Sequence, residues 1–374
     1  MLLSGDRFHV KYRLTGTEQE AYLKAKDICL EQTVEFPEEL LPQNFIRESI
    51  VGRIESFNAS GDQAYHAVIS YAVETTANEL TQLLNVIYGN ISIKPGIRVE
   101  SVDLPDALLQ RFRGPRFGRD GLRSLLDIPV RPLLFTALKP MGLSAQELAR
   151  IAYQLAFGGI DIIKDDHGLT DQCFAPFEER IRLCAAAVQE ANSKTGRKSI
   201  FVANVTAPSH QVVAKAHQAK AAGAGGIMVA PALVGLDTMR QLADDDTLGL
   251  PVISHPAFQG SYVTSADHGI SHAALFGQIA RLAGADTTIY PNFGGRFSFS
   301  RAECESIAQA AQQPMGAIKA IFPSPGGGMT LERIPELLAV YGRDVIFLIG
   351  GGLFKHSPDI LNNCRHFRDM VEKF

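Results

Sequence analysis

An apolar stretch of the sequence at residues 158–163 ends abruptly in four ionisable side chains. The stretch is followed by Lys164, Asp165, Asp166 and His167. A buried strand requires apolar residues, but its packing does not require four titratable groups at its end. Because side chains alternate between the two faces of a strand, Lys164 and Asp166 are predicted to share one face, and His167 opens the next loop. A cation and carboxylates that converge there suit a metal site or proton transfer; a partly solvated ion pair is the structural alternative.

The overall composition indicates a globular protein without a broad charged surface. The chain has 374 residues, of which 46% are hydrophobic, and a formal net charge of -4 at pH 7. This content is ample for a core, and the mild negative charge argues against nucleic acid and anionic membranes as partners. No apolar run approaches the roughly 18 residues of a membrane span, and the first residues lack the pattern of a secretory signal. We therefore expect a cytoplasmic protein that meets an anionic substrate through local contacts.

The pattern of apolar runs divides the chain near residue 125. Residues 1–125 mix strand-like and helical segments, which predicts an α+β domain of the ferredoxin-like kind. The predicted strands there are 8–14, 49–57 and 65–73, and the predicted helices are 18–30 and 77–88. Residues 126–374 contain eight apolar runs, at 133–138, 160–163, 200–203, 226–230, 251–254, 287–289, 317–321 and 345–349. Amphipathic segments recur between them, which predicts a (β/α)8 TIM barrel as the catalytic domain in preference to an open doubly wound sheet.

Polar side chains follow several of the predicted barrel strands. In a barrel these positions share the rim at the carboxyl ends of the strands, where barrel enzymes keep their chemistry. The predicted rim residues are Lys139, Lys164, Asp166, His167, Asn204, His255, Gln259, Tyr290 and Asn292. They come from separate segments, so their convergence predicts an active site.

Two glycine-rich turns follow the last two predicted strands. The first contains Gly326 and Gly327, and the second contains Gly350 and Gly351. Glycine lets backbone amides approach an oxyanion closely, and the rim after the seventh and eighth strands is where barrels often hold phosphate. The sequence therefore predicts a phosphate site at these four glycines, although glycine also simply permits tight turns.

Several of these segments together resemble one known family. Leu138-Lys139-Pro140 precedes Gly142-Leu143-Ser144, and the strand that begins at Gly158-Gly159 runs to Asp166. Farther along the chain are Asn204-Val205-Thr206 and Gly350-Gly351-Gly352. In order and spacing they are similar to the barrel of the ribulose-bisphosphate carboxylase (RuBisCO) large chain. An α+β domain ahead of a barrel is also the layout of that family, so the resemblance covers nearly the whole chain.

The resemblance implies roles for individual residues of the barrel. Lys164 would take up CO2 as a carbamate and thereby become an oxygen ligand of Mg²⁺ beside Asp166. Lys139 would act as an acid or base near the enolising carbon, and His255 would belong to the same site. The carboxylates of Asp165 and Asp166 are expected to keep Lys164 protonated unless metal binding favours the carbamate.

The resemblance also implies an assembly. Active sites of the family are built between two subunits, which implies a homodimer or a multiple of dimers. The matching residues of the amino-terminal domain are Glu31 and Asn90, expected to face Lys164 of the other subunit.

Departures from the carboxylase pattern change the expected reaction. The carboxylases carry a lysine that polarises CO2 on the loop after strand six, but residues 291–318 contain no lysine. Pro256 stands where an arginine that holds a phosphate is expected, and Gln259 and Tyr290 stand where histidines are expected. A substrate with one phosphate therefore fits better than a bisphosphate. This pattern is typical of RuBisCO-like proteins, which enolise, isomerise or decarboxylate phosphorylated keto-sugars instead of fixing CO2.

Two residues leave alternatives open. His167 stands where the family has a glutamate as a metal ligand, and imidazole is a softer donor without the negative charge. The site would then bind Mg²⁺ more weakly or prefer ions such as Mn²⁺, or His167 would act as a general acid or base, or be structural. Arg296, on the loop after strand six, either restores part of the phosphate site or is a solvated loop arginine.

We expect a metal-dependent enolising enzyme, an isomerase or tautomerase, acting on a phosphorylated ketose or keto acid without fixing CO2. Its metal ligands would be carbamylated Lys164 and Asp166, with His167 as a candidate third ligand and Mg²⁺ as the cofactor. One alternative is a decarboxylase or transcarboxylase-hydrolase of a branched-sugar acid phosphate. Another is a barrel that has lost catalysis and serves as a binding or structural subunit.

Overall fold

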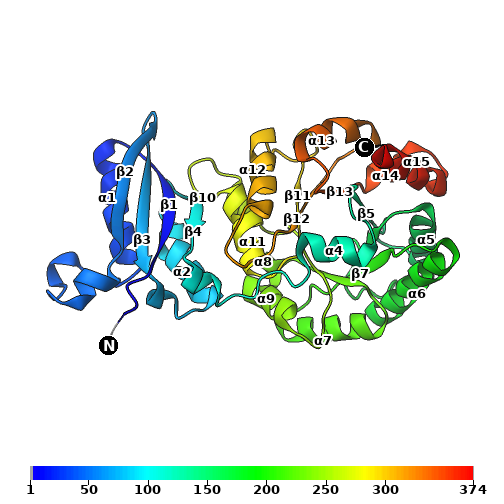
Figure 1. Cartoon of the computed structure of the whole chain (residues 1–374), viewed down its shortest axis with the longest axis horizontal. Coiled ribbons are helices and arrows are strands. Elements are labelled where there is room, and N and C mark those ends of the chain that lie inside the picture. Colours follow the sequence, from blue (N-terminus) through cyan, green and yellow to red (C-terminus); the bar gives the residue numbers. More distant parts are fainter. Residues whose placement is uncertain (1–2, 374) are drawn as a thin grey trace.

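The structure of the protein is a computed structural model that describes residues 3–373. Two sheets organise it, a mixed five-stranded sheet in the amino-terminal part and an eight-stranded parallel sheet in the rest (Figure 1). The first part contains β1 (Arg7–Thr15), α1 (Glu18–Glu31), β2 (Arg53–Gly61), β3 (Ala64–Ala72), α2 (Leu80–Tyr88), β4 (Ile97–Asp103) and α3 (Asp106–Leu109). Short helical turns η1 (Glu38–Leu40), η2 (Ile46–Ile50), η3 (Val73–Thr76) and η4 (Asn90–Ile93) link them.

The amino-terminal sheet has the strand order β10-β4-β1-β3-β2. The side chains of β1 alternate between the two faces of the sheet. Those on the inner face are fully buried, namely Phe8, Val10, Tyr12 and Leu14, and the residues between them are not. Strand β4 was not among the predicted strands. Strand β10 (Gly269–Ile270) belongs to the carboxyl-terminal part of the chain and pairs with β4 in parallel, so the two parts of the chain share a sheet.

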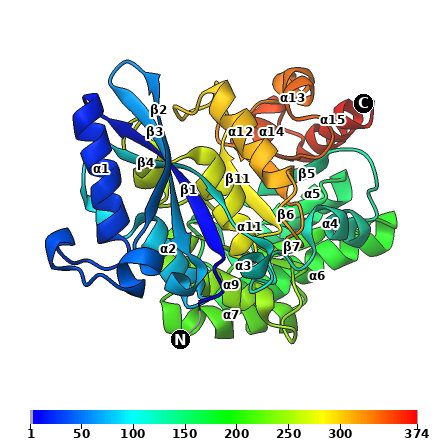
Figure 2. The ribbon, with the colours of Figure 1, turned by 60° about the vertical axis from the view of Figure 1, so that its left-hand side comes forward.

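The second sheet closes into a barrel of eight parallel strands, which confirms the predicted fold (Figure 2). Its strands are β5 (Leu133–Ala137), β6 (Ile162–Lys164), β7 (Ile200–Asn204), β8 (Gly226–Val229), β9 (Val252–Ser254), β11 (Thr287–Pro291), β12 (Phe322–Gly326) and β13 (Ile346–Leu348). The helices around it are α5 (Ala145–Gly158), α6 (Phe177–Thr195), α7 (Ser209–Ala221), α8 (Pro231–Val234), α9 (Leu236–Asp244), α10 (Gly260–Val263), η5 (Ala273–Ile279), α11 (Ala280–Leu282), α12 (Arg301–Gln312), η6 (Leu331–Arg333), α13 (Ile334–Tyr341), α14 (Gly351–His356) and α15 (Ile360–Glu372). No helix within residues 3–373 is both long enough and apolar enough to cross a bilayer.

The seventh barrel strand differs from its prediction. Residues 317–321 were expected to form this strand, but it is β12, which begins at Phe322. The sequence did not indicate this strand, because it contains Pro323 and Pro325, and proline is rare inside sheets. The Phe322 amide donates to the Asp286 carbonyl, on the side of β11, so the backbone nitrogens of both prolines face β13. No ladder pairing joins β12 to β13 among the described residues, so neither proline removes a ladder hydrogen bond.

The amino-terminal end of the barrel is filled by apolar side chains. Leu122 and Leu126 of α4 (Gly118–Leu126) pack with the inward side chains of the strands, among them Phe135, Ile162 and Phe322. Complete burial of side chains of this size contributes about 1.5–3 kcal/mol each before the entropy of ordering is subtracted. The interior at this end is therefore a packed core, and chemistry is confined to the opposite end.

A buried carboxylate attaches α4 to the barrel. Asp286 is inaccessible to solvent and accepts hydrogen bonds from the backbone amides of Phe117 and Gly118 at 2.7 and 2.6 Å, and from Val252 at 2.8 Å. Burial raises the pKa of Asp286 to about 6, although the three amides favour the ionised form. Because the pKa is raised on folding, the stabilising contribution of this group is present at low pH and lost as the pH rises through about 6.

We expect Asp286→Asn to change both the free energy of unfolding and the way in which it depends on pH. The new amide keeps an acceptor for two of the hydrogen bonds but presents N–H to the Val252 amide, which costs about 1–3 kcal/mol. Because Asn does not titrate, the stability of the wild type relative to the variant should fall by about 3 kcal/mol between pH 4 and pH 8. Denaturant unfolding across this range, with exposed Asp62→Asn as the control, measures both effects; a difference that grows with pH would contradict them.

Candidate active site

Alternation along β6 determines which of its side chains enter the barrel. Ile162 packs in the interior cluster and Ile163 packs outside the barrel against the helices, so Lys164 again points inward. Lys164 is the last residue of β6, and its side chain is almost fully buried. The following Asp165 turns outward and Asp166 inward, which places Lys164 and Asp166 on the predicted common side.

Asp166 is the centre of the polar cluster at the mouth of the barrel. Its Oδ2 accepts a hydrogen bond from Lys139 Nζ at 2.7 Å, and its Oδ1 is paired with His167 Nδ1 at 3.2 Å. Burial alone would raise the pKa of Asp166, but these two hydrogen bonds and the charge of Lys164 outweigh it and hold the pKa below its usual range. Asp166 is therefore an ionised carboxylate, the form that binds metal ions.

The amine of Lys164 is less basic than the sequence implied. Burial is the largest effect and lowers the pKa of Lys164 to about 8; the charge of Lys139 adds to it, and Asp166 and Asp165 oppose it. Burial thus outweighs the two carboxylates and lowers the pKa of this amine, but with a pKa of about 8 the amine is still mostly protonated at pH 7. The Lys164 Nζ donates to the backbone carbonyl of Asp165 at 2.9 Å. A larger neutral fraction favours reaction with CO2, since only the unprotonated amine is a nucleophile.

Asp165 has a positioning role outside the polar cluster. Its carboxylate is paired with Arg180 of α6, Oδ1 to Nε at 3.1 Å, and both side chains are inaccessible to solvent. Its Oδ2 also accepts a hydrogen bond from the backbone amide of Asn204 at 3.1 Å. Arg180 further donates to the carbonyls of Thr170 and Ala175 and so fixes the loop that follows His167. Arg180 was not predicted as a site residue, because a charged residue in a helical segment is usually exposed to solvent.

His167 and His255 lie face to face at the mouth. Their ring centroids are 4.7 Å apart with planes 12° from parallel. Burial, followed by the charge of Lys164, lowers the pKa of His255 well below its usual value, so this imidazole is neutral. Its Nδ1 accepts from the Ala257 amide at 3.2 Å, which leaves the ring proton on Nε2. Two rings from β6 and β9 loops therefore meet beside Asp166, as the rim prediction requires.

The cluster fits a divalent metal ion only in part as it stands. No three His, Cys, Asp or Glu side chains converge on one metal position within the described residues. Asp166 supplies a hard carboxylate, and His167 beside it supplies one imidazole nitrogen. A carbamate on Lys164, whose ammonium form repels cations, would provide the missing oxygen donor and a negative charge. The donor set thus fits Mg²⁺ when Lys164 is carbamylated.

One of the two glycine turns lies next to this cluster. A Cβ atom placed on Gly350 would be 3.7 Å from Lys139 Cε, so the second turn adjoins the lysine. In the first turn, Gly327 and Gly328 have φ values of 81° and 93°, which side chains other than glycine adopt at a cost. No described residue accepts a hydrogen bond from the amides of Gly327, Gly328 and Gly350. These amides are free to bind an anion.

Gly326 departs from its predicted place in the first turn. It is the last residue of β12, because that strand begins later than the sequence pattern indicated. Its carbonyl accepts a hydrogen bond from the Asn292 amide at 2.8 Å, which continues the contact with the neighbouring strand. The turn itself consists of Gly327 and Gly328, and Gly328 was not among the predicted phosphate ligands.

Some predicted rim residues lie outside the polar cluster. Tyr290 is fully buried in the outer core, because its neighbour Ile289 occupies the inward position on β11. Asn292 is buried and accepts from the Tyr341 hydroxyl at 2.6 Å. The side-chain amide of Asn204 donates to the carbonyls of His167 and Leu169, so it fixes the loop that follows β6. The rim prediction therefore fails for Tyr290 on β11 and for Asn292 directly after it.

Glu31 and Asn90 form a separate pair on the amino-terminal domain. Asn90 Nδ2 donates to Glu31 Oε1 at 3.1 Å, and Lys94 Nζ lies 3.3 Å from Glu31 Oε2. Figure 1 places α1, which ends at Glu31, beyond the amino-terminal sheet and remote from β5 and β13. The two residues are brought together but do not join Lys164 of the same chain.

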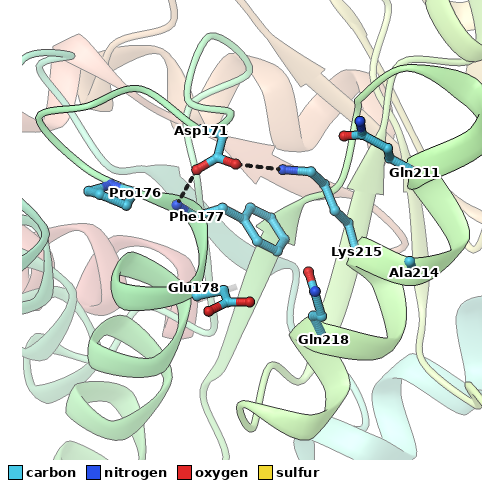
Figure 3. A pocket seen from close by; sticks show the side chains of 8 residues that line it. All are labelled: Asp171, Pro176, Phe177, Glu178, Gln211, Ala214, Lys215 and Gln218. Atoms are coloured by element: carbon cyan, nitrogen blue, oxygen red, sulfur yellow. Dashed lines mark hydrogen bonds and ion pairs between the residues drawn. The ribbon is translucent and has the colours of Figure 1, made fainter.

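A cavity of about 400 Å³ lies outside the barrel mouth, between the start of α6 and α7 (Figure 3). Asp171 spans it, accepting from the Phe177 amide and pairing with Lys215 at 3.3 Å. Lys215 Nζ also lies 4.2 Å from the centre of the Phe177 ring. None of the predicted site residues lines this cavity, and its Asp171 and Lys215 side chains are paired with each other.

Comparison with known proteins identifies the fold and the family. The family described as the ribulose bisphosphate carboxylase large chain, catalytic domain, matches residues 119–372. The chain belongs to the RuBisCO large-chain family. It is 36% identical to RuBisCO-like protein 1 of Rhodopseudomonas palustris over 98% of both chains, and 37% identical to the 5-methylthioribulose-1-phosphate isomerase of Rhodospirillum rubrum over 94% and 92% of the two chains.

Solved structures of the RuBisCO family superpose on the whole chain. A RuBisCO-like protein from Rhodopseudomonas palustris has a TM-score of 0.89 at 37% identity and 98% coverage of both chains. An octameric RuBisCO from Pyrococcus horikoshii has a TM-score of 0.91 at 26% identity, covering 100% of this chain and 90% of that one. The architecture is thus shared by carboxylases and RuBisCO-like proteins, and the reaction must be argued from the site.

We expect Arg180→Met to destabilise the RuBisCO-like barrel by about 3–5 kcal/mol, because it leaves the Asp165 carboxylate buried without a partner. Adding Asp165→Asn should recover part of the loss, since the neutral amide still accepts from Asn204. Arg182→Met, an exposed change in the same helix, is the matched control in denaturant unfolding. Equal stability of all three variants would show that the buried pair contributes little.

Proposed function

We propose that the protein is a metal-dependent enolising isomerase of a singly phosphorylated ketose, and that it does not fix CO2. The observation that carries this proposal is the position of Lys139. Its Nζ pairs with Asp166, and its aliphatic chain adjoins Gly350 in the second glycine turn. A substrate whose phosphate binds the glycine amides would therefore extend toward the lysine and the carboxylate.

The names of two relatives favour a phosphorylated keto substrate. The isomerase of Rhodospirillum rubrum is named for 5-methylthioribulose-1-phosphate, and a relative from Geobacillus kaustophilus at 31% identity is named 2,3-diketo-5-methylthiopentyl-1-phosphate enolase. Both names describe a carbon chain with a phosphate at carbon 1. We propose the same class of substrate here, a ketose 1-phosphate, and prefer isomerisation because that relative is more similar.

Different residues of the chain would carry out the two proton transfers, one at carbon and one at oxygen. Lys139, partly exposed beside Asp166, would move a proton at the carbon next to the carbonyl. The neutral His255 has its ring proton on Nε2 and would donate to an oxygen of the substrate. A divalent ion held by carbamylated Lys164, Asp166 and His167 would supply positive charge that stabilises an enolate oxygen. Reprotonation at a neighbouring carbon gives the isomer.

The absence of carboxylation follows from the loop after β11. In the carboxylases a lysine on this loop polarises CO2, and residues 291–318 contain none. Pro256, directly after His255, also lacks the guanidinium that would hold a second phosphate. We therefore propose that CO2 acts only as an activator that modifies Lys164.

We also propose that active sites are completed by a second subunit. Asn90 and Lys94 hold the Glu31 carboxylate on the amino-terminal domain, away from the barrel mouth of the same chain. RuBisCO structures among the relatives include a dimer from Hyperthermus butylicus and octamers from Pyrococcus horikoshii. A homodimer would bring the Glu31 and Asn90 pair of one subunit to Lys164 of the other.

Exchange of substrate hydrogen with deuterated solvent tests the reaction directly. Lys164→Ala should abolish exchange into a ketose 1-phosphate, because no carbamate can form, and Lys164→Glu should keep a trace through its permanent carboxylate. Wild-type exchange should require a divalent ion and rise with bicarbonate that is not consumed, since carbamate and metal favour each other. Lys198→Ala, an exposed change, is the control in NMR assays. Full activity in CO2-free buffer would contradict the carbamate.

Mixing two inactive variants tests the shared site. Glu31→Gln and Lys164→Ala should regain activity when their subunits are exchanged, because a mixed dimer holds one site with both residues intact. Lys139→Met mixed with Lys164→Ala is the matched control, since both changes fall on the barrel side and every mixed site keeps one defect. Restoration in the control, or none in the test pair, would contradict the shared site.

A further inference from the structure

The loop between β11 and α12 is attached to the barrel at both ends. Phe293 is buried beneath Arg333, whose guanidinium carbon lies 5.1 Å from the ring centre and whose Nη1 donates to the Phe293 carbonyl at 2.9 Å. Phe299 is buried against His272, edge to face with ring centroids 4.3 Å apart. The tip between these two anchors, residues 294–298, carries Arg296 and Phe297.

The tip rests on the first glycine turn. The Arg296 amide donates to the Gly327 carbonyl at 3.1 Å. A Cβ atom on Gly327 would come within 2.8 Å of the Phe297 ring, and one on Gly328 would come within 2.8 Å of Arg296 Cγ. Both glycines thus leave room for the side chains of the tip. This places the Phe297 ring and the aliphatic part of the Arg296 side chain against the turn whose amides are free to bind an anion.

The guanidinium of Arg296 has no acidic partner. No carboxylate of the described residues lies within 4.0 Å of it, and its central carbon lies 5.2 Å from the centre of the Phe297 ring. In contrast, Arg301 at the start of α12 is paired with Glu305 at 2.8 Å, and Arg333 is paired with Glu336 at 3.0 Å. An unpaired cation held beside unpaired amides is complementary to a phosphate.

We propose that Arg296 is the cationic ligand of the substrate phosphate at the Gly327-Gly328 turn, and that Phe297 covers the bound phosphate from water. This inference rests on the proposed function and adds to it the group that balances the phosphate charge. The glycine amides donate hydrogen bonds but carry no net charge, and Lys139 is engaged with Asp166. Arg296 therefore supplies the charge, and exclusion of water by the phenyl ring strengthens that interaction.

Calorimetric titration with inorganic phosphate tests the assignment without any turnover. Arg296→Met should weaken phosphate binding about 10- to 100-fold, the effect expected for loss of a charge-assisted pair. Arg301→Met removes a neighbouring charge that already has a partner and should leave the affinity unchanged. Phe297→Ala should weaken binding less and make it more sensitive to salt, because the anion is then exposed to solvent. Equal affinities of wild type and Arg296→Met would overturn the proposal.

Steady-state kinetics separate this inference from the proposed function. With an active ketose 1-phosphate, Arg296→Met should raise KM by a similar factor. Exchange by the wild type with an unchanged KM in the variant would overturn the role of Arg296 and preserve the isomerase. Phosphate binding that depends on Arg296, without exchange into any ketose phosphate, would preserve the anion site and overturn the isomerase.

Discussion

The structure depends on the inward, outward, inward order of three successive side chains at the end of β6. Lys164 and Asp166 enter the barrel, and Asp165 between them is directed into the packing of α6. A carboxylate in that position is tolerated because Arg180 and the Asn204 amide pair with it. Arg180 then binds two carbonyls of the next loop, so the ion pair outside the barrel fixes the groups inside it.

Much of the fold could be predicted from the sequence because its strands are short apolar runs separated by helices. One exception was β12, because its two prolines argue against a strand in the sequence. They are tolerated because their backbone nitrogens face β13, where no ladder hydrogen bond is made. Strand β10 could not be predicted either. Two residues carry no periodicity, and their pairing with β4 is a contact between distant parts of the chain.

The sequence was enough to predict which residues meet in the site, but not how strongly each of them binds a proton. Five predicted site residues converge because each lies at or just after the carboxyl end of a strand of one barrel: Lys139, Lys164, Asp166, His167 and His255. The basicity of Lys164, however, depends on how burial compares with neighbouring charges, and the sequence shows only the charges. Likewise, Tyr290 was placed on the rim because its register on β11 was unknown, and alternation puts it in the outer core.

The arrangement explains how the chemistry of this family can change while the barrel is retained. The interior below Lys164 is apolar and closed by α4, so substitutions there disturb packing. At the mouth, side chains such as Pro256 and Arg296 stand on loops whose ends are fixed elsewhere, by β9 and by buried Phe293 and Phe299. A loop can therefore lose the lysine expected of a carboxylase and present an arginine to a glycine turn without cost to the core. The glycine turn and the inward carboxylate of Asp166 depend on the backbone and the barrel, so they can be retained when the loops change.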